Sequence, residues 1–426
     1  MTRKMKDSGV EWIGEIPESW EISKVRRGFR VSKTIAGDKA NELPRLSLSN
    51  AGVLERPKYD GFGESPADYA TYQIIPVGQF VFNFMGLEQD SLYRRVGISP
   101  MTGLVSAGYM EADYISTQIN PEYAYYFFRF MENGLLFKQY GSGIRSNLNK
   151  QQFHNMPLLF PPLDEQARIS AVIKHKVEAI DTIIAETQQS IDELKKYKQA
   201  LITETVTKGL DKNVEMKDSG VEWIGVTPEN WEITKLKYLS KISRGRFNHR
   251  PRNDPEFYSG EYPFIQTGEV ARASEKISSY SQTLSEKGKE VSQEFKKGTI
   301  MMTIAANVGD VAILEFNSYA PDSLIGFSPS PKVNTKYLYY LLKALKNDLL
   351  MFSIISTQLN LNIDIVKERH IPFCSDKGQQ NELVNYLDRK LHNIDSLIIE
   401  KQKIVNECNT YKQSLIYEYV TGKKEA

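Results

Sequence analysis

Met5-Lys-Asp-Ser-Gly-Val-Glu-Trp-Ile-Gly14 opens the sequence and returns letter for letter as Met216-Lys-Asp-Ser-Gly-Val-Glu-Trp-Ile-Gly225. Each copy continues into the pattern Pro-Glu-x-Trp-Glu-Ile, at Pro17–Ile22 in the first half and at Pro228–Ile233 in the second. A match of this length at two places in one chain indicates that a single folding unit occurs twice.

A second echo closes each half of the chain. Tyr197-Lys-Gln-Ala-Leu-Ile202 in the first half corresponds to Tyr411-Lys-Gln-Ser-Leu-Ile416 in the second. Two anchors in the same order indicate a tandem duplication of a unit of roughly 210 residues. Duplication of this kind tends to build a molecule with internal two-fold symmetry, and such a molecule suits a two-fold partner.

The composition is that of an ordinary globular protein. Hydrophobic residues make up 41% of the chain and charged residues 25%. The formal net charge of +1 does not decide for or against nucleic acid, because a neutral total can hide basic patches. Cys374 and Cys408 are the only cysteines, so neither a disulfide framework nor a zinc site is expected, and a reducing cytoplasm fits. No apolar run reaches membrane-spanning length, so no membrane association is expected.

Each half divides into a globular stretch and a long helical one. The globular stretches contain short strand-like runs, frequent Gly and Pro, and one apolar helical patch each, which together predict a mixture of α and β structure. The runs with this character are Gln79–Asn83 and Tyr123–Phe137 in the first half, and Thr299–Ile304, Gly309–Leu314 and Tyr337–Leu350 in the second.

The helical stretches span about 164–208 and 378–421, and neither contains a proline. Apolar residues recur in them at steps of three and four, which places them on one stripe of a helix. Each member of the second stripe lies 214 positions after its counterpart in the first. Each stripe is interrupted by one polar residue, Thr187 in the first and Lys401 in the second, and these two are also 214 positions apart. The stripes comprise Ile169, Ile173, Val177, Ile180, Ile184, Ile191, Leu194, Tyr197 and Leu201, then Leu383, Leu387, Leu391, Ile394, Ile398, Val405, Cys408, Tyr411 and Leu415.

Stripes of this kind usually lie on the core of their own domain. A helix of this length would extend about 65 Å, however, which is much longer than a globule is wide, so most of each stripe needs another helix. Because the order is globule, helix, globule, helix, a second helix that packs along the first must run back. The sequence therefore predicts an antiparallel pair with one globule at each end, the chain termini near each other, and Thr187 beside Lys401 near a pseudo-dyad. The predicted coiled-coil interface comprises Ile173, Ile180, Ile184, Thr187, Ile191, Leu194, Leu387, Ile394, Ile398, Lys401, Val405 and Cys408.

Motifs for catalysis are weak throughout the sequence. There is no GxxxxGK[ST] phosphate loop. Phe160-Pro-Pro-Leu163 lacks the amide and the ring of a methyltransferase motif and is typical of a stop before a helix. Glu193-Leu-Lys195 and Glu294-Phe-Lys296 resemble parts of a metal-dependent nuclease site. The first is typical of a charged face of the coiled coil, however, and the second has no convincing upstream Asp partner. No catalytic residue and no metal site is therefore predicted.

Basic residues cluster at matching places in the two halves. Ser23–Lys33 and Lys235–Arg252 each follow the Trp-Glu-Ile pattern and contain neither Asp nor Glu. Such a run can be a solvated face, but its density beside Gly, Asn, His and Phe favours contact with nucleic-acid phosphates. Smaller candidates are Arg94, Arg95 and the Gly-rich turn that carries Arg145 and Asn147, which suit base edges. The complete set of DNA-binding candidates is Lys24, Arg26, Arg27, Arg30, Lys33, Arg94, Arg95, Arg145, Asn147, Lys235, Lys237, Lys241, Arg244, Arg246, His249, Arg250 and Arg252.

Taken in order, these features resemble the specificity subunit of a type I restriction-modification system. The resemblance covers essentially the whole chain and rests on the opening motif in both halves, the helix entry Pro161–Gln166, the Tyr-Lys-Gln-x-Leu-Ile endings, and Ala305, Asn307 and Gly309–Leu314. The second helix entry, Pro372–Gln380, keeps only its final Gln, which puts the start of that helix in question.

The resemblance implies an α+β fold in which two mixed α/β target-recognition domains, in tandem repeat, are separated by a long antiparallel two-helix coiled coil with pseudo-two-fold symmetry. The implied divisions are residues 1–163 and 211–375 for the recognition domains, and 164–210 and 376–426 for the spacer helices. The implied function is non-catalytic: each recognition domain reads one half of a split double-stranded DNA site. Two methyltransferase (M) subunits and restriction (R) subunits are the implied protein partners. S-adenosylmethionine would be bound by those partners, so this chain is expected to hold no cofactor.

Two other functions remain open from the residues. A coiled-coil scaffold that joins two protein-binding domains without DNA would explain the near-neutral charge and the lack of an active site. A self-contained nuclease would cut DNA in the presence of magnesium. The recognised bases cannot be derived from the sequence, because the geometry of the divergent globules is not visible in it.

Overall fold

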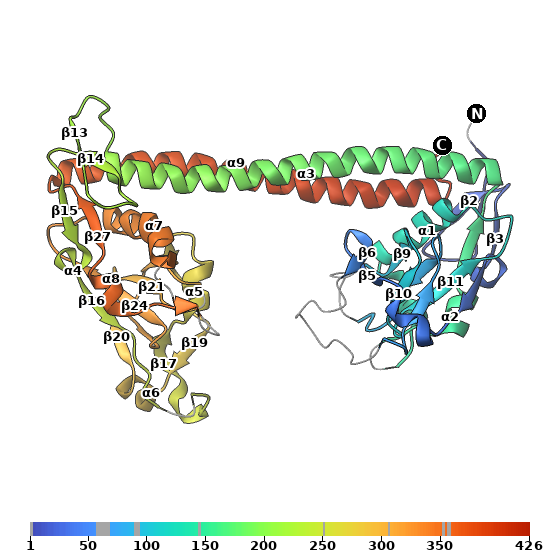
Figure 1. The fold of residues 1–426 in the computed structure, drawn as a ribbon, viewed down its shortest axis with the longest axis horizontal. Coiled ribbons are helices and arrows are strands. Elements are labelled where there is room, and N and C mark those ends of the chain that lie inside the picture. Colours follow the sequence, from blue (N-terminus) through green and yellow to red (C-terminus); the bar gives the residue numbers. More distant parts are fainter. Residues whose placement is uncertain are drawn as a thin grey trace. The chain divides into compact units, whose positions relative to one another are not determined.

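A computed structural model describes residues 3–56, 69–88, 94–143, 146–249, 252–305, 307–351, 354–355 and 359–426. The chain forms two compact units (Figure 1), Met1–Gln188 with Lys403–Ala426, and Gln189–Gln402. Two long helices, α3 (Leu163–Lys208) and α9 (Lys377–Val420), contribute residues to both units. Each unit therefore combines one globule with one part of each helix.

The globule of unit 1 contains two four-stranded sheets, with strand orders β4-β11-β8-β9 and β6-β5-β10-β7, and two two-stranded antiparallel pairs, β1-β2 and β12-β3. Helix α1 (Pro121–Asn133) and the short α2 (Lys150–Asn155) follow the strands. The strands are β1 (Met5–Asp7), β2 (Glu15–Pro17), β3 (Glu21–Lys24), β4 (Phe29–Ser32), β5 (Arg45–Ser49), β6 (Gly52–Arg56), β7 (Gln73–Ile75), β8 (Phe80–Phe82), β9 (Val96–Ile98), β10 (Gly103–Val105), β11 (Met110–Tyr114) and β12 (Pro157–Phe160), with 3-10 turns η1 (Val25–Arg27), η2 (Gly37–Asn41) and η3 (Leu136–Tyr140).

The globule of unit 2 contains a five-stranded sheet, β16-β24-β21-β22-β18, a four-stranded sheet, β19-β17-β23-β20, and the pairs β13-β14, β15-β27 and β25-β26. The strands are β13 (Met216–Asp218), β14 (Val226–Pro228), β15 (Glu232–Lys235), β16 (Ser240–Arg244), β17 (Tyr258–Phe264), β18 (Lys276–Ile277), β19 (Gln282–Leu284), β20 (Gln293–Phe295), β21 (Ile300–Thr303), β22 (Val311–Leu314), β23 (Ser318–Ala320), β24 (Leu324–Pro329), β25 (Ile354–Ile355), β26 (Leu359–Asn360) and β27 (His370–Phe373). The helices are α4 (Leu236–Leu239), α5 (Thr267–Arg272), α6 (Glu286–Glu290), α7 (Thr335–Met351) and α8 (Ile363–Lys367), with the 3-10 turn η4 (Pro255–Phe257).

The two globules share one topology although their letters differ. The order β4-β11-β8-β9 corresponds strand for strand to β16-β24-β21-β22, and β6-β5-β10-β7 corresponds to β19-β17-β23-β20. The one parallel pair in the second sheet, β5 with β10, has its counterpart in β17 with β23. Gly78 and Gly298 mark the same turn before β8 and β21, and both adopt the left-handed backbone conformation, with φ of +82° and +86°. The duplication therefore includes the globules and not only the helices.

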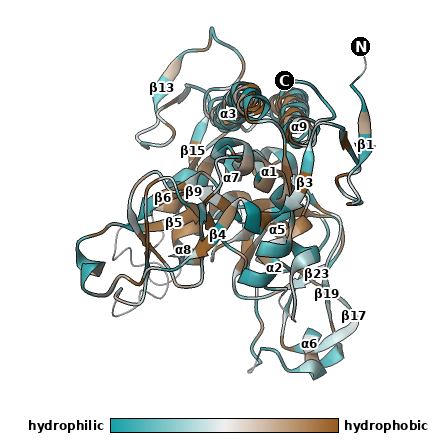
Figure 2. Cartoon of the chain, turned by 90° about the vertical axis from the view of Figure 1, so that its right-hand side faces the viewer, coloured by the Kyte–Doolittle hydropathy of each residue, from teal (hydrophilic) through white to brown (hydrophobic). Residues whose placement is uncertain are grey.

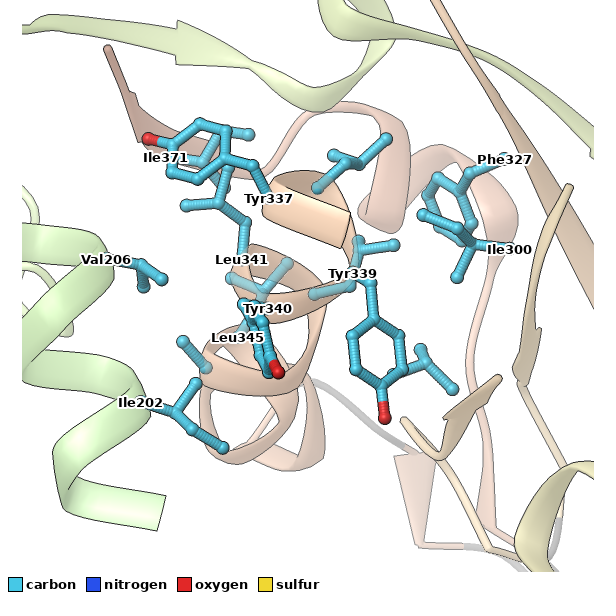
Figure 3. Close-up of a cluster of buried hydrophobic side chains, with 14 of the residues drawn as sticks. Ile202, Val206, Ile300, Phe327, Tyr337, Tyr339, Tyr340, Leu341, Leu345 and Ile371 are labelled. Atoms are coloured by element: carbon cyan, nitrogen blue, oxygen red, sulfur yellow. The ribbon is translucent and has the colours of Figure 1, made fainter. Parts of the chain in front are cut away.

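Each globule packs against parts of both long helices. In unit 2, α7 lies between Ile202 and Val206 of α3 and the sheet residues Ile300 and Phe327 (Figure 3), and these side chains belong to one buried cluster. Helix α1 has the same role in unit 1, where its cluster includes residues of α3 and of α9, namely Ile169, Ile173, Leu415, Ile416, Tyr419 and Val420. Burial of such large apolar clusters is the main force that holds each unit together.

A buried tryptophan joins the two long helices in each unit. In unit 1, Nε1 of Trp20 donates to Glu165 at the start of α3 (2.9 Å), and a Cβ on Gly422, just beyond α9, would lie 2.9 Å from the same ring. Farther along α3, Asp181 forms an ion pair with Lys412 of α9 (2.5 Å). Because the later residue of α3 meets the earlier residue of α9, the two segments are antiparallel in this unit.

A tryptophan also joins the two long helices in unit 2, where it contacts the start of α9 and the end of α3. Nε1 of Trp231 donates to Gln379 at the start of α9 (3.2 Å), and a Cβ on Gly209, just beyond α3, would lie 3.4 Å from that ring. Lys198 of α3 forms an ion pair with Asp395 of α9 (2.5 Å). The predicted antiparallel pairing is therefore present in both units.

The two long helices start in the same way, despite the different sequences before them. Gln166 and Gln380 are both fully buried, and the side-chain oxygen of each accepts from a backbone N–H, of Asn120 or of Asn334, at 2.7 Å. The amide nitrogen of each donates to two further backbone carbonyls. The single Gln that the second entry retains is thus the residue that fixes the start of the helix.

The predicted stripe is buried or half-buried except at one position in each helix. Tyr197 and Tyr411 are 56% and 55% exposed, so their assignment to the stripe was wrong. The last turns of each helix pack on the globule as well as on the other helix. In these turns the buried side chains include Ile202 and Ile416, whereas the two tyrosines are exposed. The predicted interface residues otherwise lie on this buried or half-buried stripe. Thr187 lies in unit 1 and Lys401 in unit 2, and their pairing stays a prediction.

Figure 2 shows the two long helices end-on, and each carries both hydrophilic and hydrophobic residues, as amphipathic helices do. Within the part of the chain that the structure describes, no helix is long and apolar enough to cross a membrane.

Candidate nucleic-acid interface

The first basic run spans the end of β3, η1 and β4. Lys24, Arg26, Arg30 and Lys33 are exposed there. Arg27 differs from them, because its guanidinium binds the carboxylate of Glu21 and the side chain of Gln118 and lies 4.8 Å from the centre of the Phe160 ring. Four cations of this run are therefore presented to solvent, while Arg27 is held by its own unit.

The second basic run spans the end of β15, α4 and β16, the counterparts of the elements above. Lys235 and Lys237 both donate to Glu368, at 2.7 and 2.6 Å. Hydrogen bonds from these two lysines lower the pKa of Glu368 to about 2. Lys241 is exposed on β16. Part of the positive charge of this run is thus neutralised by an acidic residue from another segment.

Beyond β16, the second run folds over Asp322. Arg252 forms an ion pair with its carboxylate (2.7 Å), and Nε of Arg244 donates to its backbone oxygen (2.8 Å). Arg246 donates to the backbone of Ser292, and the ring of His249 stacks on Phe257 and lies 3.2 Å from Asp254. Arg244, Arg246 and Arg252 are exposed despite these contacts, and Arg250 lies outside the described residues.

The smaller candidates lie inside unit 1. Arg95 is buried and donates to the backbone oxygens of two residues of the 83–88 loop, whereas Arg94 is half-buried and donates to Tyr125. The side chain of Asn147 accepts from the backbone of Gly86 and so holds its turn against the same loop. Arg145 lies outside the described residues. The DNA-contacting role of these residues stays a prediction.

Beside the first run lies a cavity of about 520 Å³, which we name the β11 pocket. Its lining combines two of the predicted residues with polar and aromatic side chains from distant parts of unit 1. Those relevant to its chemistry are Ser32, Lys33, Gln73, Glu111, Asn147 and Lys150.

Beside the second run lies a cavity of about 550 Å³, which we name the β17 pocket. It brings Arg252 together with aromatic rings and with two glutamines, Gln266 and Gln282, whose side chains are hydrogen-bonded at 2.5 Å. Gln and Arg side chains are suited to base edges, and aromatic rings to stacking. Its residues include Phe247, Arg252, Tyr258, Phe264, Gln266 and Gln282.

The sequence did not single out most of these pocket residues. Gln73, Glu111 and Lys150 of the β11 pocket are separated by about 40 positions each. They lie on β7, β11 and α2, which the packing of the two sheets and this helix brings together. An acidic residue in a short strand-like run is the only signal that marks Glu111. Among the residues that the structure describes, no group of three or more His, Cys, Asp or Glu side chains could hold a metal ion.

The comparisons with known proteins agree with this architecture. The family model of the type I restriction modification DNA specificity domain matches residues 104–196 and 228–407, which is more than half of the chain. A putative type I restriction enzyme MjaX specificity subunit of Methanocaldococcus jannaschii is 24% identical over 433 residues, covering 96% of this chain and 95% of that protein. The MjaVIII specificity subunit of the same organism is 23% identical over 350 residues, covering 75% and 74% of the two chains.

A solved structure has the same fold. It comes from work on the structural basis underlying complex assembly and conformational transition of the type I R-M system. It matches this chain with a TM-score of 0.71 at 15% sequence identity. The match covers 96% of this chain and 99% of the other. The chain therefore belongs to the family of DNA specificity subunits of type I restriction-modification systems.

Proposed function

We propose that this DNA specificity subunit is non-catalytic and reads a split double-stranded DNA site, with unit 1 recognising one half-site and unit 2 the other. The observation that carries the proposal is the pairing of one topology with two different pockets. A common frame would place each reader on DNA in an equivalent way, and the different linings would select different bases.

The contacts that position the protein would come from the exposed cations of the two basic runs. Lys24, Arg26, Arg30 and Lys33 in unit 1 and Lys241 in unit 2 are available for phosphate contact. Such contacts release counterions and give affinity without sequence preference. The base contacts would then come from the pockets beside the runs.

The protein partners would be two methyltransferase subunits and, outside them, restriction subunits. The parts of the chain that are alike in both halves, the opening hairpins and the ends of the long helices, would present the same surface twice to two copies of one partner. The methyltransferases would bring S-adenosylmethionine and would receive the target adenine flipped out of the duplex. DNA as the partner and two free cysteines support a location in the cytoplasm.

A gel-shift assay with the purified chain, with and without methyltransferase subunits, tests the proposal. Random-sequence duplex should be shifted weakly and in a salt-dependent way, and a duplex that contains the split site should be shifted at far lower protein concentration. A scaffold without DNA recognition, the alternative function, would shift neither duplex under any of these conditions. Cutting of DNA by the chain alone in magnesium would instead reveal a nuclease.

A further inference from the structure

The carboxylate of Glu111 lies buried in the β11 pocket. Glu111 is only 1% exposed. In the described part of the chain, its Oε1 has no hydrogen-bond partner, and neither has Oγ of Ser32. Glu111 of β11 pairs directly with Ser32 of β4, so both side chains lie on the same face of the sheet. Both line the pocket.

This face of the sheet is turned toward the second sheet of unit 1. Glu111 also pairs with Val81 of β8, and Val81 packs in a cluster with apolar residues of the second sheet. Gln73 of β7 reaches the same pocket from that sheet; it is 2% exposed, and its amide nitrogen donates to the backbone oxygens of Ser106 and Tyr109. The pocket therefore penetrates between the two sheets, with Glu111 and Ser32 among its lining residues.

An unpartnered buried carboxylate is unfavourable for folding. Burial, with the negative charge of Asp113 on the same strand, raises the pKa of Glu111 to about 7, and Lys33 opposes this rise. The other titratable groups of the pocket are Lys150 and Tyr109. Loss of hydration without a compensating hydrogen bond costs free energy, so a residue with a purely structural role would be expected to be apolar here.

In the second recognition domain, the position equivalent to Glu111 is apolar. Val81 lies three residues after Gly78, and Met301 lies three residues after the equivalent Gly298; their partners on the next strand are Glu111 and Gly326. A Cβ on Gly326 would lie 2.5 Å from the ring of Phe295, so the ring fills the space that a side chain would need. The common frame therefore does not require a carboxylate at this position.

We infer that Glu111 accepts a hydrogen bond from the exocyclic amino group of one base in the half-site read by unit 1. In the major groove, such amino groups are N4 of cytosine and N6 of adenine, and a carboxylate is a suitable acceptor. Ser32 beside it can donate to the neighbouring N7 if the base is adenine. Lys33 and Lys150 at the same pocket supply positive charge for the adjacent phosphates. This inference rests on the proposed function.

The first test replaces the acceptor in the complete complex. The full chain and a Glu111→Leu variant are each produced with the methyltransferase subunits in a strain without other adenine methylation, and methylated adenines are mapped across the genome. In the variant, one position in one half-site should lose its preference, with discrimination reduced roughly 5- to 150-fold, while the other half-site is unchanged. An identical motif for both proteins would overturn the inference.

A control and a second measurement make the test independent of folding. Glu165 is also buried in unit 1, but its carboxylate already binds Arg3 and Trp20, so Glu165→Gln should leave the motif unchanged. The second measurement is the binding of the natural chain to modified duplexes. In these duplexes, purine replaces an adenine, or 2-pyrimidinone replaces a cytosine, at each such position of the first half-site. One analogue at one position should weaken binding by the same factor, and that analogue identifies the base; equal binding of all analogues would contradict the inference.

The two claims fail in different ways. If the natural complex methylates no split motif, the proposed function is wrong. If it methylates a split motif that Glu111→Leu and the analogues leave intact, only the role of Glu111 is wrong. A further readout is pH: binding by the natural chain should strengthen from pH 6 to pH 8 as Glu111 loses its proton, and binding by the Leu variant should lack this component.

Discussion

The two recognition domains share strand order, parallel pairing and turn geometry, but they differ in the side chains that face their pockets. At one equivalent position, unit 1 has the buried carboxylate of Glu111 and unit 2 has Gly326 under the ring of Phe295. By contrast, Trp20 and Trp231, and Gln166 and Gln380, make the same kinds of contact in both units. The contacts common to both units maintain the frame, and the positions that differ are those at which the proposed recognition would be set.

The largest effect is expected from the tryptophans that join the helices. Trp20→Ala and Trp231→Ala each remove a fully buried ring, and each should lower the free energy of unfolding of its own unit by about 3–5 kcal/mol. Denaturant titration of the full chain, with hydrogen exchange to assign the loss to a unit, measures this. Because the two sites are equivalent, the two costs should be similar.

Trp12 and Trp223 provide the matched controls. Both are only half-buried, and each donates one hydrogen bond to its own globule. Their replacement by Ala should cost clearly less than that of Trp20 or Trp231. A large cost for Trp20 with a negligible cost for Trp231 would break the equivalence of the two units.

The next effect concerns Glu111 and depends on pH. Its pKa in the folded protein is about 7, above the usual 4.5, so the protonated form is favoured by folding. The associated stability is fully present below about pH 4.5 and is lost as the pH rises through 7. Glu111→Gln should therefore be more stable than the natural chain by about 3 kcal/mol at pH 8, with little difference at pH 4.5. Thermal unfolding over this pH range checks the sign, and a constant difference would count against it.

A smaller effect should distinguish the two basic runs in DNA binding. Replacement of Arg26 and Arg30 by Ala should reduce the slope of log affinity against log salt concentration by about 0.9 for each phosphate group that the variant no longer neutralises. The same change at Lys235 and Lys237 should reduce it less, because Glu368 already holds both lysines. Titrations of the complex at several salt concentrations provide the slopes, and an unaltered slope for the first pair would refute the assignment.

The smallest effect is expected from the ion pairs between the long helices. Asp181 with Lys412, and Lys198 with Asp395, are equivalent pairs that remain partly exposed. Exposed pairs contribute about 0.2–1 kcal/mol, so a double-mutant cycle at either pair should give a coupling in that range. A coupling of several kcal/mol at one pair alone would show that the two units are not held in the same way.

The long helices could be predicted almost to the residue. The expected spans of about 164–208 and 378–421 compare with Leu163–Lys208 and Lys377–Val420, because apolar periodicity over so many turns is a strong signal. The error at Tyr197 and Tyr411 arose where the helix ends also face a globule, since a single stripe cannot describe two packing partners.

The recognition domains could be predicted only as a mixture of α and β structure. Their common topology depends on strand pairs far apart in the chain, and few letters reveal it apart from turn residues such as Gly78 and Gly298. The two basic runs could be identified in the sequence. The sequence did not show that Glu368 and Asp322 partly neutralise the charge of the second run. The sequence does not show that Ser32, Gln73 and Glu111 line one pocket, because Gln73 lies on a different sheet from the other two and the packing of the two sheets brings it to them.

The two units, which share one topology, are proposed to recognise two different half-sites. Genome-wide mapping of methylated adenines, in otherwise identical strains with and without this gene, would reveal both half-sites at once. We expect one split motif with two unlike halves and a fixed non-specific gap, present only when the gene is present. A single continuous motif, or a methylation pattern that is the same without the gene, would show that the two units do not read a split site.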